Sequence, residues 1–142
     1  MRAKRFLEQY GRQVKKIRRI EHQIEALDDL FDFPQDMTSE KVQSSPKPDR
    51  IGEIVARKAD KVDELWQEVC RAQDLMDEIE AVINKVKRED LRLLLTLRYI
   101  NLKKWREVEE VMGFDSQQRW VHKLHGKALY EVDKIIGQLS SE

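Results

Sequence analysis

The stretch EVMGFDSQQRWVHKLH, Glu110 to His125, determines how the C-terminal third of this chain folds. Glycine readily adopts the left-handed conformation that ends many helices, so Gly113 predicts a helix end. Ser116 can cap a following helix, whose first turn then carries the polar sequence QQR. The stretch is therefore either a turn that presents a helix to DNA or a corner in an all-helical core.

The segments on both sides of this turn have helical periodicity. DLRLLLTLRYI, residues 90–100, predicts a short apolar helix that Asp90 can cap and that Asn101 can end in the left-handed conformation. In the next helix, WREVEEVMG, the residues expected to face inward are Trp105, Val108, Val111 and Met112. In the last helix they are Val121, Leu124, Ala128, Leu129, Val132, Ile135 and Ile136. Three short helices around a small core, with a tight glycine turn before the last, are typical of a helix-turn-helix.

The N-terminal half predicts two long helices. Residues 3–31 carry apolar side chains at the three-and-four spacing of one helical stripe: Leu7, Tyr10, Val14, Ile17, Ile20, Ile24, Leu27 and Phe31. The first two-thirds of this predicted helix carry basic side chains, and its end carries acidic ones. Residues 51–86 keep a heptad seam in which only Lys58 is polar: Val55, Val62, Val69, Met76 and Ile83, with Lys58, Leu65, Ala72, Ile79 and Val86.

A loop, residues 32–50, separates these helices and contains all three prolines. Because proline restricts its own backbone and that of the preceding residue, we expect Ser45 to Pro48 to be extended. The loop returns the chain, so the fold class is all-α: a long antiparallel helical hairpin, residues 1–88, followed by a small helix-turn-helix bundle, residues 89–142. The remaining seam on the second helix predicts self-association into a homo-oligomer, with no argument for dimer over higher states.

The composition of the chain limits which partners and which cellular compartment the protein can have. The 27 basic and 27 acidic side chains cancel, so any DNA contact must be local. The chain has neither the apolar core of a signal peptide nor a run long enough to cross a bilayer, which predicts a cytoplasmic protein with no membrane partner. Cys70 is the single cysteine and is expected to be structurally indifferent.

Catalytic and metal chemistry have little support in the sequence. His122 and His125 have one-turn spacing, but no further histidine or cysteine completes a zinc set. The acidic group around Asp28 and Asp32 lies at a helix end, where solvated carboxylates are ordinary, and lacks a phosphate-binding glycine loop. We therefore expect no metal, no cofactor and no enzymatic activity.

The sequences LRYINLKKWREVEEVMG and VHKLHGKAL resemble the C-terminal region of small sigma factor region 4-like proteins encoded by phages and prophages of Gram-positive bacteria. The loop sequence KVQSS and the preceding long helix also resemble that family, so the resemblance covers nearly the whole chain. Its most specific pieces are RYI, W-x-E-V, MG and LHGKAL in that order. The resemblance implies phage transcriptional regulation through a helix-turn-helix in the cytoplasm of the bacterial host. Contact with host RNA polymerase stays open as a second partner.

Two features depart from the family pattern. Family members commonly place a small residue four positions before the turn glycine, where the two helices approach closely, and this chain has Glu109. The connection from Gly113 to Val121 is also about two residues longer than the usual turn of this family. Both departures affect where the last helix begins and how closely it approaches the helix before it. They therefore affect which of its side chains would face the bases of a bound DNA.

A recognition helix places its N-terminal side chains toward base edges in the major groove of double-stranded DNA. Gln pairs well with adenine and Arg with guanine, whereas Lys mainly neutralises phosphate. The candidates on the last helix are Gln117, Gln118, Arg119, His122 and Lys123, and those at the start of the preceding helix are Lys103, Lys104 and Arg106. An ordinary solvated helix surface is the alternative interpretation of the same residues. Trp120 adjoins Val121 of the predicted core, so it is expected in the core or at the groove edge and not as a platform for base stacking.

Two other functions remain open. A small terminase-type DNA-packaging adaptor also combines a helix-turn-helix with long oligomerising helices, and it forms a ring. A coiled-coil interaction protein would bind a protein partner without DNA, which Glu109 and the longer turn favour and the QQR helix start disfavours. The mass of the protein in solution distinguishes a ring-forming packaging adaptor from a dimer. A DNA-binding assay distinguishes the coiled-coil interaction protein from the regulator and from the packaging adaptor.

Overall fold

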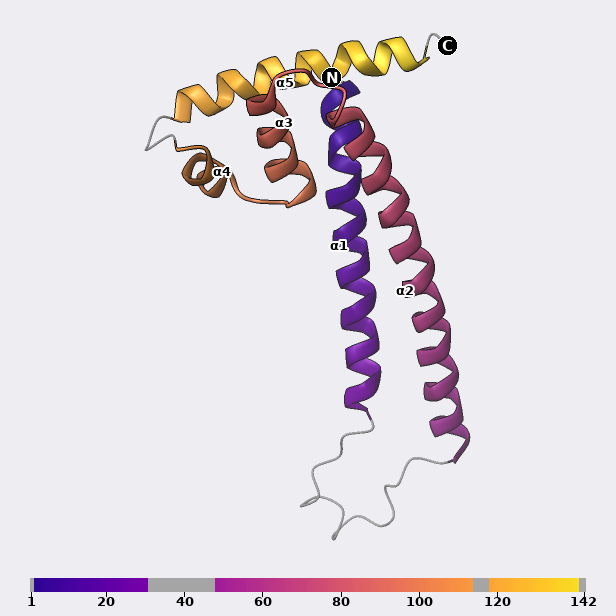
Figure 1. The fold of residues 1–142 in the computed structure, drawn as a ribbon. Coiled ribbons are helices and arrows are strands. Elements are labelled where there is room, and N and C mark those ends of the chain that lie inside the picture. The colour runs from indigo at the N-terminus through magenta and orange to yellow at the C-terminus, as the bar shows by residue number, and fades with distance from the viewer. Residues whose placement is uncertain (1, 31–47, 114–117, 141–142) are drawn as a thin grey trace. The chain divides into compact units, whose positions relative to one another are not determined.

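The computed structural model describes residues 2–30, 48–113 and 118–140, and within these ranges every regular element is a helix (Figure 1). In chain order they are α1 (Arg2–Asp29), α2 (Pro48–Ile83), α3 (Glu89–Leu95), the π-helix η3 (Thr96–Ile100), α4 (Trp105–Met112) and α5 (Gln118–Ser140). None of these described helices has the length and apolar character that crossing a membrane requires. The predicted all-α class is confirmed.

The chain divides into two compact units. Unit 1 comprises residues 1–13 and 72–142, and unit 2 comprises residues 14–71. The boundaries fall inside α1 and α2, whereas the sequence suggested a division after residue 88. The physical reason is that Ala3, Leu7 and Ile79 belong to the same hydrophobic core as the C-terminal helices.

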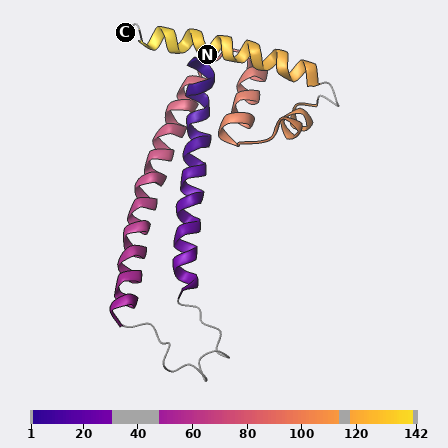
Figure 2. The same ribbon diagram turned by 180° about the vertical axis from the view of Figure 1, so that it is seen from behind.

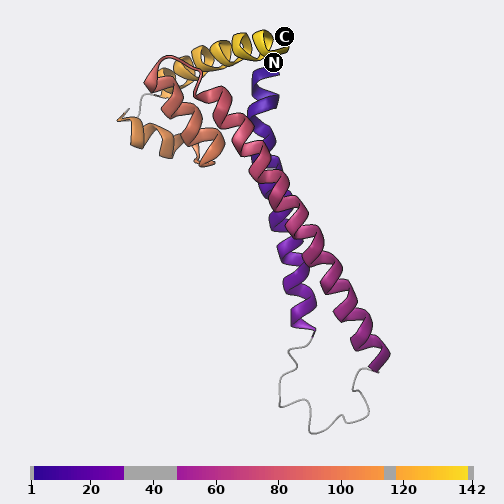
Figure 3. The ribbon, with the colours of Figure 1, turned by 45° about the vertical axis from the view of Figure 1, so that its right-hand side comes forward.

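Unit 2 is an antiparallel pair formed by the second half of α1 and the first part of α2 (Figures 1 and 3). Lys16 Nζ lies 3.2 Å from Glu68 Oε1, and Asp28 pairs with Lys58. The later residue of α1 is thus paired with the earlier residue of α2, as antiparallel helices require. Ile20 is buried on the α1 side. These contacts are those of the predicted hairpin.

The heptad seam of α2 has two different environments. Ala72, Ile79 and Ile83 are buried in unit 1, whereas Val55 and Val69 in unit 2 are 54% and 37% exposed. The predicted seam is therefore buried in unit 1 and only partly covered in unit 2, where Val62 and Leu65 are half-buried. The expectation that Pro48 is extended was wrong, because it begins α2. Proline fits the first helical position, where a backbone N–H has no helical acceptor.

One hydrophobic core holds unit 1 together, and all its helical segments contribute to it. From the N-terminal part of α1 come Ala3 and Leu7, which pack with residues at the end of α2 and with α3, η3, α4 and α5. The buried residues of these later elements are Ile79, Val82, Ile83, Val86, Leu91, Leu94, Leu95, Leu97, Tyr99, Val108, Val121, Leu124, Ala128, Leu129 and Val132. α5 packs across α3 (Figures 1 and 2).

Three local expectations required correction. Arg88, not Asp90, is the N-cap of α3, and the Asp90 carboxylate instead accepts hydrogen bonds from the Leu91 amide and the Arg88 side chain. Asn101 has ordinary helical dihedral angles, and Leu102 takes the left-handed conformation with φ 55°. Leu102 Cδ2 would lie 3.3 Å from a Cβ added at Gly11, so the glycine in α1 makes room for this turn. Val111 was expected inside but is 54% exposed.

The predicted end of α4 is confirmed. Gly113 has φ 78° and its N–H reaches the Glu110 carbonyl oxygen at 3.3 Å. Seven predicted inward residues of α5 are buried or half-buried, from Val121 to Ile136. Ser116, expected to cap α5, lies outside the described residues.

Two glycine-to-alanine substitutions should have opposite effects on stability. Gly113→Ala should lower the free energy of unfolding by about 1 kcal/mol, because a Cβ there has free space but an unfavourable left-handed backbone. Gly126→Ala, inside α5 with nothing near its added Cβ, should raise it by about 0.5 to 1 kcal/mol. Urea unfolding followed by circular dichroism measures both. Equal effects of the two substitutions would contradict this account of the α4 end.

Candidate nucleic-acid interface

A cluster of five side chains joins η3, α4 and α5 inside unit 1: Arg98, Tyr99, Trp105, His122 and His125. The Trp105 ring meets the His125 ring edge-on, with centroids 4.6 Å apart, and the His122 ring at 5.5 Å. Arg98 places its guanidinium carbon 4.6 Å from the centre of the Trp105 ring. These contacts set the position of α5, which carries most of the candidate DNA contacts, against the start of α4.

Tyr99 and His125 form the polar centre of this cluster. The Tyr99 hydroxyl and His125 Nε2 are 2.6 Å apart, and the two rings stack with centroids 5.8 Å apart. Burial lowers the pKa of His125 to about 4, with smaller contributions from Lys4, Arg98 and His122. Burial, followed by the charge of Glu8, raises the pKa of Tyr99 to about 12. At neutral pH the phenol and the imidazole are therefore both uncharged, and a single hydrogen bond joins them.

The π-helix and the turn after it bring Arg98 and Tyr99 to this point. The Asn101 amide donates to the Thr96 carbonyl at 2.9 Å, and the Lys103 amide donates to the Leu97 carbonyl at 3.0 Å. Arg98 Nη1 donates to the Lys103 carbonyl at 3.0 Å, so the same side chain closes the turn and covers Trp105. π-helical turns often occur at functional sites, and this one was not anticipated from the sequence.

The candidate cations before and in α4 differ in exposure. Lys103 is half-buried, and its Nζ lies 3.9 Å from Glu107 Oε2. Lys104 is the N-cap of α4, with extended backbone, and is exposed. Arg106, in the first turn of α4, is also exposed. Lys104 and Arg106 are thus the two cations here that are accessible to a phosphate.

The candidates on α5 are only partly described. Gln118 and Arg119 lie in the first turn of α5, without a described side-chain position, and Gln117 lies outside the described residues. His122 and Lys123 are exposed on the same helix. Trp120 is 53% exposed, so the core position that was one of its two expected places is wrong, and a place at a groove edge stays a prediction. Lys123 Nζ lies 5.5 Å from the centre of its ring.

Glu109, the departure from the family pattern, is buried in α4 with 7% of its surface exposed. A carboxylate is larger than the small residue expected there, so it limits how closely another helix can approach this face of α4. Its position on the buried side explains why a family pattern would favour a small residue.

The residues Arg98, Tyr99 and His125 were not candidates in the sequence. A signal was available, because RYI, W-x-E-V and LHGKAL, the motifs that carry the resemblance, contain every residue of the cluster except His122. Motif membership does not reveal contact, since these residues are separated by a π-helix and a turn that periodicity does not predict.

Metal ligation finds no support in the parts of the chain that the structure describes: no group of three or more His, Cys, Asp or Glu side chains there is placed to hold an ion. No protein-family model, curated protein or solved structure matches this chain. The functional assignment therefore rests on the residues and the geometry of unit 1.

The His125 ring makes the stability of unit 1 depend on pH. Its pKa is lowered in the folded protein from 6.5 to about 4, so its contribution is complete above pH 6.5 and is lost as the pH falls toward 4. The loss should be about 1 to 2 kcal/mol, which is below the full shift because the ring is partly exposed. His125→Gln should show a smaller loss of unfolding free energy between pH 7.5 and 4.5 than the wild type.

Urea unfolding at the two pH values measures this difference, and the wild type and the variant share all other titrating groups. Tyr99→Phe is the companion variant, and it should cost about 1 kcal/mol at pH 7.5 through loss of the hydrogen bond. The same pH dependence in wild type and His125→Gln would rule out a neutral, buried role for His125.

Proposed function

We propose that this protein is a phage or prophage DNA-binding transcriptional regulator that acts through the helix-turn-helix formed by α4 and α5. The observation that carries the proposal is the order at the end of the chain: a short helix, a left-handed glycine, and a long helix whose exposed side bears cations. The resemblance of the surrounding motifs to sigma factor region 4-like proteins supports it.

In this proposal α5 is the recognition helix, entering the major groove of double-stranded DNA at its N-terminal end. Gln117, Gln118 and Arg119 read base edges, while His122 and Lys123 lie one turn further along the helix. Lys104 and Arg106 hold the phosphate backbone from the start of α4, with Lys103 contributing less because it is half-buried. Recognition requires no cofactor and no catalysis.

The cluster around Trp105 supports this role physically. Reading bases requires a recognition helix whose position is fixed to within about 0.5 Å. A site that is about 1 Å too loose fails. The Trp105, His125 and Arg98 contacts fasten α5 to α4 and η3 without using the exposed side of α5. The part of α5 around His125 is thereby held against α4 and η3.

We further propose that the protein self-associates through α2 in the cytoplasm of a bacterial host, with host RNA polymerase as a possible second partner. The support lies in unit 2, where four large apolar side chains on α2 are substantially exposed: Ile51, Val55, Trp66 and Val69. Their spacing places them along one side of the helix. A second copy presents the same stripe, so the surface can bury itself in a symmetric pair.

Two other functions are tested by the same measurements. A small terminase-type packaging adaptor would form a ring, which solution mass distinguishes from a dimer. A coiled-coil interaction protein would use the exposed stripe of α2 for a protein partner and would not bind DNA. The buried Glu109, which restricts approach to α4, is the observation that favours this second candidate.

The DNA proposal predicts different effects for two cations on α5. After selection of a preferred duplex from a random library, Arg119→Ala should weaken binding to it by about 1 to 3 kcal/mol and reduce discrimination at one base pair. Lys123→Ala should weaken binding to all duplexes alike and lower the salt slope by about one. Fluorescence anisotropy across several salt concentrations measures both.

Arg57→Ala, which removes an exposed arginine from unit 2, is the matched control and should leave duplex binding unchanged. If no duplex is enriched, or if Arg119→Ala changes neither affinity nor discrimination in a folded protein, α5 is not a recognition helix.

The self-association proposal predicts that Val69→Asp converts the oligomer to a monomer. Val69 is 37% exposed, so the substitution spares the fold of unit 2 but places an unpaired charge in the contact between copies. Sedimentation velocity of the full chain measures the mass. Gln67→Asp, on an exposed polar position of the same helix, is the control and should keep the wild-type mass. A monomeric wild type would contradict the proposal.

A further inference from the structure

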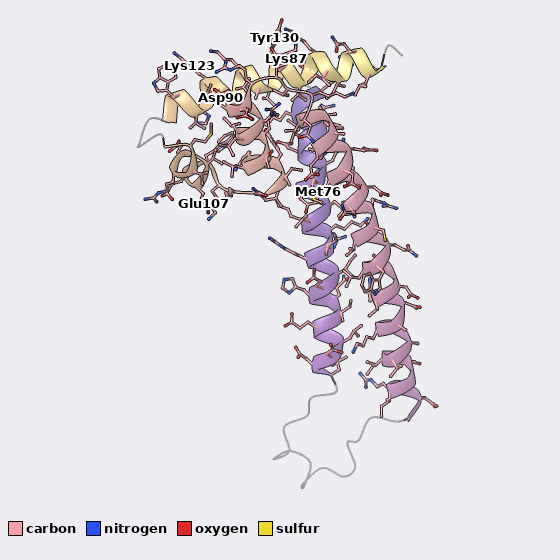
Figure 4. The ribbon with its side chains drawn as sticks, in the orientation of Figure 1. Met76, Lys87, Asp90, Glu107, Lys123 and Tyr130 are labelled. Atoms are coloured by element: carbon pink, nitrogen blue, oxygen red, sulfur yellow. The ribbon has the colours of Figure 1, made fainter. Side chains whose placement is uncertain are left out.

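The outward side of α5 carries a regular stripe of aromatic and basic residues. Trp120, Lys123, Lys127, Tyr130 and Lys134 follow one another at spacings of three and four residues, so they lie along one side of the helix. All five are exposed, with Trp120 at 53% and Tyr130 at 60%. Figure 4 shows Lys123 and Tyr130 on the side of α5 that faces away from α3.

The stripe contains two pairs of one ring and one ammonium group. Lys123 Nζ lies 5.5 Å from the centre of the Trp120 ring, and Lys134 Nζ lies 4.6 Å from the centre of the Tyr130 ring. Lys127 lies between the two pairs. In each pair the ammonium group lies over one face of the ring, so a base would stack on the opposite face. Aromatic rings and cations are the groups that bind a base and its phosphate.

The charged side chains of the stripe are three lysines, one of which pairs with a neighbouring glutamate. The stripe itself contains no carboxylate, and the adjacent Glu131 is 3.7 Å from Lys134 Nζ. An apolar protein partner would be poorly matched by three ammonium groups that must lose their hydration. A polyanion is matched by them, because phosphate contacts release bound counterions.

Entry of α5 into the major groove leaves much of the stripe unexplained. A groove-reading helix contacts bases with its N-terminal residues, and the groove is about 12 Å wide. Lys134 is fourteen residues beyond Trp120, about 21 Å along the helix axis at about 1.5 Å per residue. Tyr130 and Lys134 therefore lie beyond the end that reads duplex DNA, yet they repeat the ring-and-cation arrangement.

We propose that the stripe Trp120, Lys123, Lys127, Tyr130 and Lys134 is a binding site for single-stranded nucleic acid, which stacks bases on the two rings and places phosphates at the three lysines. This activity is distinct from duplex recognition by the first turn of α5, although Lys123 serves both. Stacking tolerates any base, so the site binds with little sequence preference. Exposed rings and lysines suit unpaired bases, because bases in a duplex have no free faces.

The test is fluorescence anisotropy of labelled 15-nucleotide oligothymidylate with the full chain, titrated at several salt concentrations. Tyr130→Ala should weaken binding about 5- to 100-fold, the range expected for losing one stacked base. Tyr130→Phe keeps the ring and should bind within about twofold of the wild type. Lys127→Gln should lower the slope of log affinity against log salt by about 0.7, the value for one phosphate contact on a single strand.

Two control variants make the result specific. Tyr130→Leu keeps an apolar side chain without a π-face, so it should lose binding as Tyr130→Ala does. Lys15→Gln removes an exposed lysine from unit 2, away from the stripe on α2, and should not change binding. An oligouridylate of the same length separates RNA from DNA, since a preference for it would show contact with the 2′-hydroxyl.

Loss of binding in Tyr130→Ala and Tyr130→Leu, with binding kept in Tyr130→Phe, supports the proposal. Binding kept in Tyr130→Leu, or in all three variants, overturns it, as does a wild type that binds neither oligonucleotide. Sequence-specific duplex binding is measured separately with Arg119→Ala. Failure of the single-strand site with intact duplex recognition is therefore distinguishable from failure of the DNA-regulator proposal.

Discussion

The packing of the N-terminal part of α1 and the end of α2 against the C-terminal helices is the constraint on which unit 1 depends. Leu7, Ile79, Leu94 and Val132 are each fully buried in one core although they come from opposite ends of the chain. Neither of the short helices α3 and α4 can bury its apolar side alone, because isolated helices of this length are only marginally stable in water. The long helices supply the missing surface, and α5 can then leave its outer side to solvent.

The resemblance motifs acquire a physical meaning in this core. Arg98, Tyr99, Trp105 and His125 meet where η3, α4 and α5 converge, with a hydrogen bond, ring contacts and a cation over an aromatic face. These interactions use directional geometry that simple apolar packing lacks, so they fix how the helices are oriented. A DNA-binding role for the unit remains our proposal, and this cluster is its mechanical basis.

The sequence predicted correctly the structural features that depend mainly on the pattern within one helix. Apolar spacing predicted the helices, the hairpin and the buried side of α5, and Gly113 predicted the end of α4. Prediction from the sequence failed where several segments act together. Leu102, and not Asn101, has the left-handed conformation, and the Leu102 side chain approaches Gly11, which lies more than ninety positions earlier in the chain. The outward position of Trp120 and the π-helix likewise depend on contacts between elements. Of the candidate DNA contacts, Gln117, Gln118 and Arg119 lack described side chains, so their roles stay predictions.

The central claim is that unit 1 presents α5 to nucleic acid, and backbone amide chemical-shift mapping of the full chain during titration with duplex DNA tests it most directly. We expect the perturbed amides to fall in the first turn of α4 and along α5, from Gln118 toward Lys123, with the amides of residues 51–69 unchanged. Perturbations confined to residues 51–69, or no perturbation at DNA concentrations well above that of the protein, would contradict the claim.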